Sequence, residues 1–297
     1  MWAETKQPAG ITFAGIGDEA GRGLVDQVRA HHLLGWSTIE LRSIHGVAFA
    51  DLDAVVFDHV TKTLNQAGLR VVCIDSRIAN WGRPITGDFD LDLVELDRLA
   101  LRCAALGTRY VRVMSYPNDG LDDEEWGRRV VQRMHVLVKC AEQAGLVLLH
   151  ENCAGWAGTD ALRARRLVEE VDSPSLRLLF DIGNGVAYGY QAYEMLPDLV
   201  QWIEHVHIKD ARRVNGETVY TLPGEGICRV ADCLSELLEH GYTGTWTIEP
   251  HLSVRPHEGL AAEGQDLVSQ FVRYGQALER LAATLDRDGS GEMSCPA

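Results

Sequence analysis

Eight short β-type runs alternate with amphipathic helical segments along nearly the whole chain, and this alternation restricts the fold more than any other feature. The candidate strands are residues 11–16, 37–42, 69–74, 109–114, 146–151, 176–181, 204–209 and 244–249. Repeated βα units with short connections form a parallel sheet with right-handed crossovers, and eight such units close a barrel. We therefore predict an α/β fold, a single (β/α)8 TIM barrel.

The segments between the strands support one continuous domain. Several helical patterns end at a glycine, as at Gly35 and Gly68, which suits a left-handed C-cap. No linker rich in Pro, Gly or Ser divides the chain. We assign residues 1–287 to the barrel and predict a disordered tail over residues 288–297.

Composition and charge restrict the cellular location and the binding partners that we expect for the chain. The chain of 297 residues is 46% apolar, has no leader-like N-terminus, and contains no apolar run of the roughly 18 residues that a membrane span needs. Its seven cysteines are odd in number and contain no C-x-x-C pair, as expected of reduced core thiols in a cytoplasmic protein. A formal charge of −15 opposes nucleic acid. Small-molecule substrates remain compatible with this composition. The sequence does not decide whether the protein forms a homo-oligomer.

Four consecutive strand candidates carry side chains that commonly bind metals. LVLLHE, LRLLFD and GTWTIE end on Glu151, Asp181 and Glu249, and EHVHIK contains His207. The C-terminal strand ends of a barrel converge on one mouth, so these side chains could face a common centre. Each carboxylate follows an apolar run, where burying an unpaired charge is costly, and a shared divalent cation would remove that cost. We therefore place the active site at the C-terminal strand ends.

Each of these residues also has an ordinary structural interpretation. A single acidic residue at a strand end more often caps a helix or pairs with an arginine, and a single histidine is more often hydrogen-bonded in the core. Their occurrence on successive strands is what favours a metal site. The loop GIGDEAG, residues 15–21, superficially resembles a dinucleotide-binding fingerprint, but its spacing departs from G-x-G-x-x-G.

The chain resembles the xylose-isomerase-like TIM barrels, particularly the sugar-phosphate isomerase and epimerase branch with ketose 3-epimerases, hydroxypyruvate isomerase and inosose dehydratase. The likeness runs from IELR through HEN, FDIGN and HVHIKDARR to GEGICRVADCLSELLEHGYTGTWTIEPH. The resemblance implies four metal ligands and one substrate-binding arginine, namely Glu151, Asp181, His207, Glu249 and Arg213. It also implies that Glu151 and Glu249 are the catalytic acid and base, on opposite faces of the sugar.

Two positions depart from the 3-epimerases of that family. Asn184 lies three residues after Asp181, where those enzymes tend to carry histidine, and Ala157 lies six residues after Glu151, where they tend to carry glutamate. Both positions touch substrate in the resembling epimerases. We therefore do not expect ordinary ketohexose 3-epimerase activity, whereas branches with a D-x-G-N pattern stay compatible. Asn184 remains a candidate substrate-binding residue.

The ligand set suggests its own chemistry. Three carboxylates and one imidazole form a hard site for one divalent ion, for which we expect Mn²⁺, with Mg²⁺, Co²⁺ or Zn²⁺ as alternatives. Such an ion is a Lewis acid that would stabilise an enediolate formed from a 2-hydroxyketone. Lys209 is a further substrate-binding candidate. Trp81 and Trp156 could pack on a sugar ring or serve only as packing residues, and Arg42 could pair with Glu40 or reach the ligand.

The leading hypothesis is a divalent-metal-dependent isomerase or epimerase of a small sugar or hydroxy-keto compound. A close alternative is a lyase of the same fold, either an inosose-type dehydratase or a C-glycoside-cleaving enzyme. A metal-dependent phosphoesterase is less favoured, because the third and fourth strands end in CIDSR and VMSYP rather than in histidines. A non-catalytic binder with a surviving metal site is the remaining alternative.

Overall fold

The predicted barrel is present in the computed structural model, which describes residues 8–256, 259 and 266–288. All eight predicted strands lie in one sheet with parallel neighbours, in the order β1-β12-β9-β8-β7-β6-β5-β2. An isolated parallel bridge between Ile16 and Glu40 brings the outer strands β1 and β2 together. The α/β fold and the single (β/α)8 TIM barrel are therefore confirmed.

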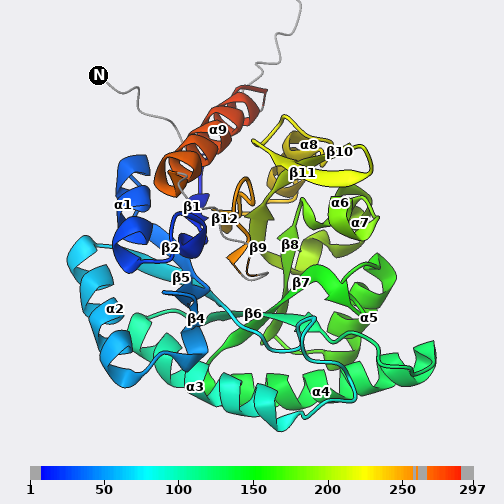
Figure 1. Ribbon diagram of the computed structural model, residues 1–297. Helices are drawn as coiled ribbons and strands as arrows, with labels where there is room; N and C mark the ends of the chain where they lie inside the picture. Colours follow the sequence, from blue (N-terminus) through cyan, green and yellow to red (C-terminus); the bar gives the residue numbers. More distant parts are fainter. Residues whose placement is uncertain (1–7, 257–258, 260–265, 289–297) are drawn as a thin grey trace, which may run out of the picture.

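The strands form the centre of the molecule and the helices surround them (Figure 1). The barrel strands are β1 (Thr12–Gly15), β2 (Thr38–Leu41), β5 (Arg70–Asp75), β6 (Tyr110–Ser115), β7 (Val147–Gly155), β8 (Leu176–Asp181), β9 (Ile203–Ile208) and β12 (Thr245–Ile248). The helices are α1 (Leu24–Leu34), α2 (Ala54–Ala67), α3 (Asp90–Leu106), α4 (Asp123–Ala144), α5 (Ala161–Val171), α6 (Asn184–Tyr188), α7 (Ala192–Leu199), α8 (Val230–Glu239) and α9 (Leu267–Asp288).

Local sequence signals explain where several helices begin and end. The side chain of Asp53 accepts a hydrogen bond from the Val56 amide at the start of α2. Gly35 and Gly68 end α1 and α2 with φ angles of 70° and 67°, a left-handed conformation that glycine adopts without strain. The two glycines keep the αβ connections into β2 and β5 short, at the end of the barrel opposite the C-terminal strand ends.

Two small hairpins interrupt the βα repeat. One joins β3 (Ser43–Ile44) to β4 (Val47–Ala48), and the other joins β10 (Asp210–Val214) to β11 (Glu217–Thr221). The sequence did not predict the second hairpin, because the polar–apolar alternation of the preceding strand runs on to Lys209 and gives no sign of a new strand. It follows β9 directly and brings Tyr220 to the mouth of the barrel.

Helices α1 and α9 pack side by side outside the seam where β1 meets β12 (Figure 1). Helix α9 ends at Asp288, next to the predicted boundary at residue 287. The predicted disordered tail lies almost wholly outside the described residues and stays a prediction. Of the helices that the structure describes, none combines the length and apolar character that a bilayer crossing requires.

Candidate active site

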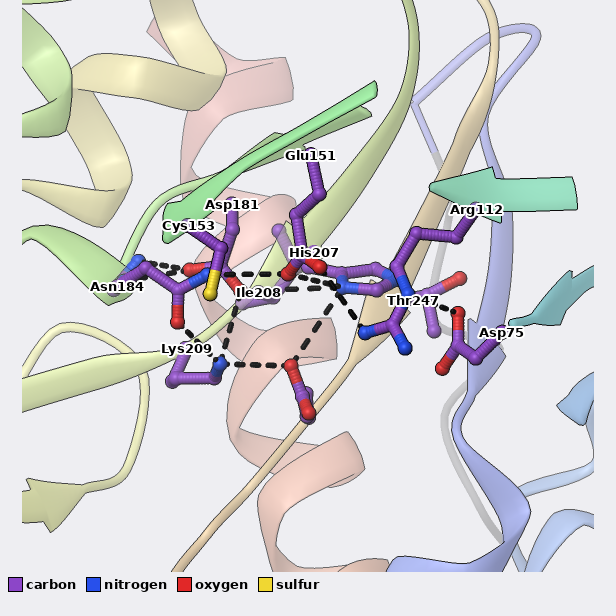
Figure 2. Close-up of polar contacts among 12 residues, drawn as sticks. Asp75, Arg112, Glu151, Cys153, Asp181, Asn184, His207, Ile208, Lys209 and Thr247 are labelled. Carbon is purple, nitrogen blue, oxygen red and sulfur yellow. Dashed lines mark hydrogen bonds and ion pairs between the residues drawn. The ribbon is translucent and has the colours of Figure 1, made fainter. Parts of the chain in front are cut away.

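The four predicted ligands meet at the mouth of the barrel. Glu151 lies on β7, Asp181 ends β8, His207 lies on β9, and Glu249 follows β12 directly. One ligand atom from each lies within 4.8 Å of the others, and all four residues are buried. Figure 2 shows Glu151, Asp181 and His207 pointing toward one another from neighbouring strands. The distances from His207 Nδ1 are 3.6 Å to Glu151 Oε1, 3.6 Å to Glu249 Oε2 and 3.9 Å to Asp181 Oδ2.

Three of these ligand atoms are buried without a hydrogen-bond partner among the described residues. They are His207 Nδ1, Asp181 Oδ2 and Glu249 Oε2. Lys209 Nζ forms ion pairs of 3.0 Å with Asp181 Oδ2 and 2.7 Å with Glu249 Oε2, so it offsets part of the negative charge. Buried polar atoms normally have hydrogen-bond partners. Three ligand atoms that lack a hydrogen-bond partner, two of them in ion pairs with Lys209, are aimed at one centre in a carboxylate-rich set, and this arrangement fits a divalent cation.

Glu40 fixes the orientation of His207, one of the four predicted ligands. Its Oε1 lies 3.0 Å from His207 Nε2, and its Oε2 lies 2.7 Å from His205 Nε2. Because a carboxylate only accepts, Nε2 of His207 carries a proton, and Nδ1 faces the ligand cluster. Burial opposes ionisation, but the two histidines hold the pKa of Glu40 well below its usual range.

The predicted pair between Glu40 and Arg42 is wrong, because the two side chains have different partners. Arg42 Nη1 donates to Glu249 Oε1 at 2.6 Å, and Arg42 Nη2 donates to Asp18 at 2.8 Å and to Glu19 at 2.7 Å. Arg42 therefore holds Glu249 from behind and does not line the cavity. Asp18 and Glu19 belong to the GIGDEAG loop, which presents carboxylates and therefore disfavours a dinucleotide phosphate there.

The carboxylate of Glu151 accepts hydrogen bonds from two residues outside the set of four predicted ligands. Arg112 Nη1 donates to Oε2 and Asn184 Nδ2 donates to Oε1, both at 3.1 Å. Burial raises the pKa of Glu151, but Arg112 and His207 outweigh it and lower the value to about 2. Sequence reasoning missed Arg112. The available signal was an arginine in the middle of the otherwise apolar run YVRVM.

A cavity of about 280 Å³ opens beside the ligand cluster. It is lined by Trp81, Arg112, Met114, Glu151, Cys153, Asn184, Ala187, Tyr188, Lys209, Tyr220, Glu249 and His251. The predicted substrate-binding residues Trp81, Asn184 and Lys209 are therefore at the wall. Lys209 Nζ also donates to Asn184 Oδ1 at 2.9 Å (Figure 2).

Two other predicted substrate-binding residues lie away from the cavity wall. Trp156 is 2% exposed and packs against Gly127 of α4. Arg213 is exposed on the hairpin and donates to the backbone carbonyls of Val186 and Gly216. The reason is geometric, since Trp156 turns toward the helix layer and β10 carries Arg213 outward, beyond the barrel mouth.

Comparison with known proteins decides the family. The model of the family described as "Xylose isomerase-like TIM barrel" matches residues 28–271, which is most of the chain. The chain belongs to the xylose isomerase-like TIM barrel family. The resemblance recognised in the sequence is thus confirmed.

Individual relatives of this xylose isomerase-like barrel have different activities. A 2-epi-5-epi-valiolone 7-phosphate 2-epimerase from Actinoplanes sp. is 34% identical over 132 residues, covering 44% of this chain and 47% of the relative. An inosose dehydratase from Geobacillus kaustophilus is 29% identical over 143 residues, covering 43% and 46%. The chain thus spans about half the length of the curated relatives that it matches.

One solved structure also shares the fold. The IOLI protein with a bound zinc atom superimposes with a TM-score of 0.72 at 15% identity, covering 92% of this chain and 98% of that one.

Proposed function

We propose that this protein is a divalent-metal-dependent isomerase or epimerase of a small sugar or hydroxy-keto compound, acting through an enediolate. The observation that carries the proposal is the convergence, beside a polar cavity, of three buried ligand atoms that lack hydrogen-bond partners among the described residues. They belong to Asp181, His207 and Glu249, and the two carboxylate atoms also form ion pairs with Lys209. The epimerase among the relatives supports the reaction class, and the zinc in the IOLI structure shows that this fold can hold a metal.

The metal would be held by Glu151, Asp181, His207 and Glu249, with Mn²⁺ as the proposed ion. When bound, it supplies Lewis-acid stabilisation for the negative charge that develops on the substrate oxygen. The donor set is hard, and the tautomer of His207 that Glu40 imposes presents Nδ1 to the ion.

The protein's own residues would position the substrate and move its protons. Glu151 and Glu249 approach the centre from β7 and from the end of β12, so each could take or return a proton at a carbon between them. Lys209 is placed to donate a hydrogen bond to the oxygen that gains charge. Asn184 and Trp81 line the same cavity and are proposed to contact hydroxyl groups and a ring face.

A lyase is the second candidate, because inosose dehydratases are among the relatives. Both reactions would begin with removal of a proton next to a carbonyl group. They differ in the next step, since a lyase expels a leaving group from the neighbouring carbon and an isomerase returns the proton. The identity of the product therefore separates the two.

The test is solvent isotope exchange. Metal-free protein would be loaded with one equivalent of Mn²⁺ and incubated in D₂O with a panel of 2-hydroxyketones and inososes, with mass spectrometry of substrates and products. We expect deuterium at the carbon next to the carbonyl group, only when metal is present. A protein that binds the metal but exchanges no member of the panel would be a binder, and one that binds no divalent ion would contradict the whole proposal.

A further inference from the structure

After β9, the seventh barrel strand, several backbone N–H groups point at one place and form an amide cradle. A side chain of the protein itself occupies this cradle. TIM barrels frequently bind phosphate at the loops after strands seven and eight, through backbone N–H groups. Here the carboxylate of Asp210 accepts hydrogen bonds from four such amides. The donors are the N–H groups of Ala211, Gly224 and Gly226, each at 2.9 Å, and of Cys228 at 3.2 Å.

The fit of Asp210 in this cradle is tight. Asp210 is 1% exposed, and a Cβ added to Gly226 would lie 2.1 Å from Asp210 Oδ1. The four amides therefore have an internal anion as their permanent partner. A phosphate group of a substrate could occupy this place only by displacing a buried, hydrogen-bonded carboxylate.

The cavity wall provides no substitute for this cradle. Among the described lining residues, only Arg112 and Lys209 carry permanent positive charge. Arg112 is 3.1 Å from Glu151 Oε2 and 3.4 Å from Asp75 Oδ1, and its Nη2 donates to the Ser76 carbonyl at 3.0 Å.

Lys209 forms ion pairs with Asp181 and Glu249, at the end of the cavity where the proposed reaction takes place. A phosphate ester at the far end of a ketose is several carbon atoms from the reacting centre, so Lys209 cannot serve both. The segment 257–265, HEGLAAEGQ, contains no lysine or arginine in its sequence.

We infer that this site accepts an uncharged polyhydroxy ketone, linear or cyclic, and excludes the phosphate esters of such compounds. The inference rests on the proposed function, because it specifies the substrate class of the same site. A dianionic phosphate would enter a wall whose cations are already paired with carboxylates, so its charge would be desolvated without a partner. Trp81, Tyr188 and Tyr220 instead offer ring faces to the C–H surface of a neutral polyol.

The first experiment compares matched pairs in the Mn²⁺-loaded protein. D-Fructose and D-tagatose would be tested against their 6-phosphates, with 2-keto-myo-inositol as a cyclic neutral probe, and deuterium exchange from solvent would be measured. We expect kcat/KM for exchange to be at least about 100-fold higher for the neutral member of a pair, the ratio for two tenfold steps in transition-state binding. Equal or faster exchange of the phosphate esters would overturn the inference and leave the proposed function standing.

The second experiment does not depend on turnover. Calorimetric titration of metal-free protein with inorganic phosphate should show no saturable binding at millimolar concentrations. Among the described residues, the two cations of the cavity wall are paired with carboxylates, and Asp210 fills the amide cradle. Saturable binding that a neutral ketose displaces would overturn the inference. If no ketose of either kind exchanged deuterium, the proposed function would fail, and this titration would still decide the inference.

A variant pair tests the cause of the exclusion. Tyr220→Arg adds a cation at the cavity wall, and Tyr220→Phe removes only the hydroxyl group. We expect the ester-to-neutral ratio of kcat/KM to rise roughly tenfold in Tyr220→Arg, about one charge-assisted hydrogen bond, and to stay unchanged in Tyr220→Phe. An unchanged ratio in a folded Tyr220→Arg protein would contradict the explanation by unpaired charge.

Discussion

Two buried acidic clusters of this barrel look alike in composition and differ in how their oxygen atoms are used. The ligand cluster is Glu151, Asp181, His207 and Glu249. The second, which we call the support cluster, is Asp92 and Glu95 on α3 with their arginine partners, Arg77 and Arg83. The carboxylates of both clusters are no more than 3% exposed.

In the support cluster every carboxylate oxygen has a donor. Asp92 Oδ2 accepts from the Tyr116 hydroxyl at 2.6 Å and Oδ1 from Arg83, while Glu95 Oε1 accepts from the Arg77 amide at 2.8 Å and Oε2 from both arginines. In the ligand cluster three atoms face one another without a hydrogen-bond partner among the described residues, and Lys209 is the cation beside two of them. Burial of charge therefore does not distinguish the two clusters, whereas the convergence of buried ligand atoms without hydrogen-bond partners does.

The largest expected effect is on turnover when Glu249 becomes Gln. This change keeps one oxygen ligand but removes the proposed base, so turnover at saturating metal should fall by roughly 10² to 10⁴ while metal affinity falls modestly. Steady-state kinetics and deuterium exchange would measure the rates, and Glu95→Gln in the support cluster is the matched control. Wild-type exchange in Glu249→Gln would reassign proton transfer to Glu151.

The next effect is on stability when Asp92 becomes Ala. Arg83 and the Tyr116 hydroxyl lose a buried acceptor, and breaking such a pair costs about 3–5 kcal/mol in the free energy of unfolding. Chemical denaturation would measure the loss. Metal affinity of the folded fraction should equal that of the wild type, and a lowered affinity would mean that the two clusters are coupled.

Metal addition should stabilise the folded protein through the ligand cluster. An ion that binds only the native state raises the free energy of unfolding by about 2.7 kcal/mol at 100 times its Kd. The Asp92→Ala variant should gain the same increment in the free energy of unfolding. The His207→Ala variant should gain a smaller increment at the same ion concentration, and its increment should approach that of the wild type as the concentration rises. Denaturation at several Mn²⁺ concentrations would show whether the increments behave in this way.

The smallest effect concerns Glu40, which touches the ligand cluster only through His207. Glu40→Gln weakens the carboxylate contact that fixes the imidazole, and such changes typically lower metal affinity about 10- to 100-fold. Metal titration of the variant and the wild type would measure this loss of affinity. Glu204→Gln on the same strand as His207 is the control, since Glu204 bonds Tyr110 and Arg177 outside the cluster. Equal affinities in both variants would remove Glu40 from the site.

Much of the fold and of the ligand cluster could be predicted from sequence, because both follow from local patterns. The eight apolar runs identified the barrel strands, and the position of a polar residue at a strand end places it at the mouth. Glu151, Asp181 and Glu249 could be proposed as ligands from their positions at strand ends, without knowledge of the residues that they contact. The converging geometry itself, however, was available only from the structure.

The partners of Glu40, Arg42 and Arg112 were not predictable in the same way. Their partners are 23 to 207 positions away in the chain, as with Glu19 and Glu249 for Arg42. Which side chains meet there depends on strand tilt and stagger, and no local pattern reports them. Trp156 and Arg213 lie away from the cavity wall for another reason. Neither the loop position of Trp156 nor the family motif around Arg213 specifies the direction of a side chain.

The seam between β1 and β12 has a consequence for how the protein folds. Thr12 pairs with Thr245, so the ring closes only after strands from distant parts of the chain have met. Such long-range pairing is slow, because loop-closure entropy is lost before the contacts form. Until β12 docks, β1 and β9 are open edges that can recruit other chains. Glu249 immediately follows β12, so the docking step that removes these open edges also brings in the last of the proposed metal ligands. Acquisition of metal by a nascent chain would therefore report that the ring has closed.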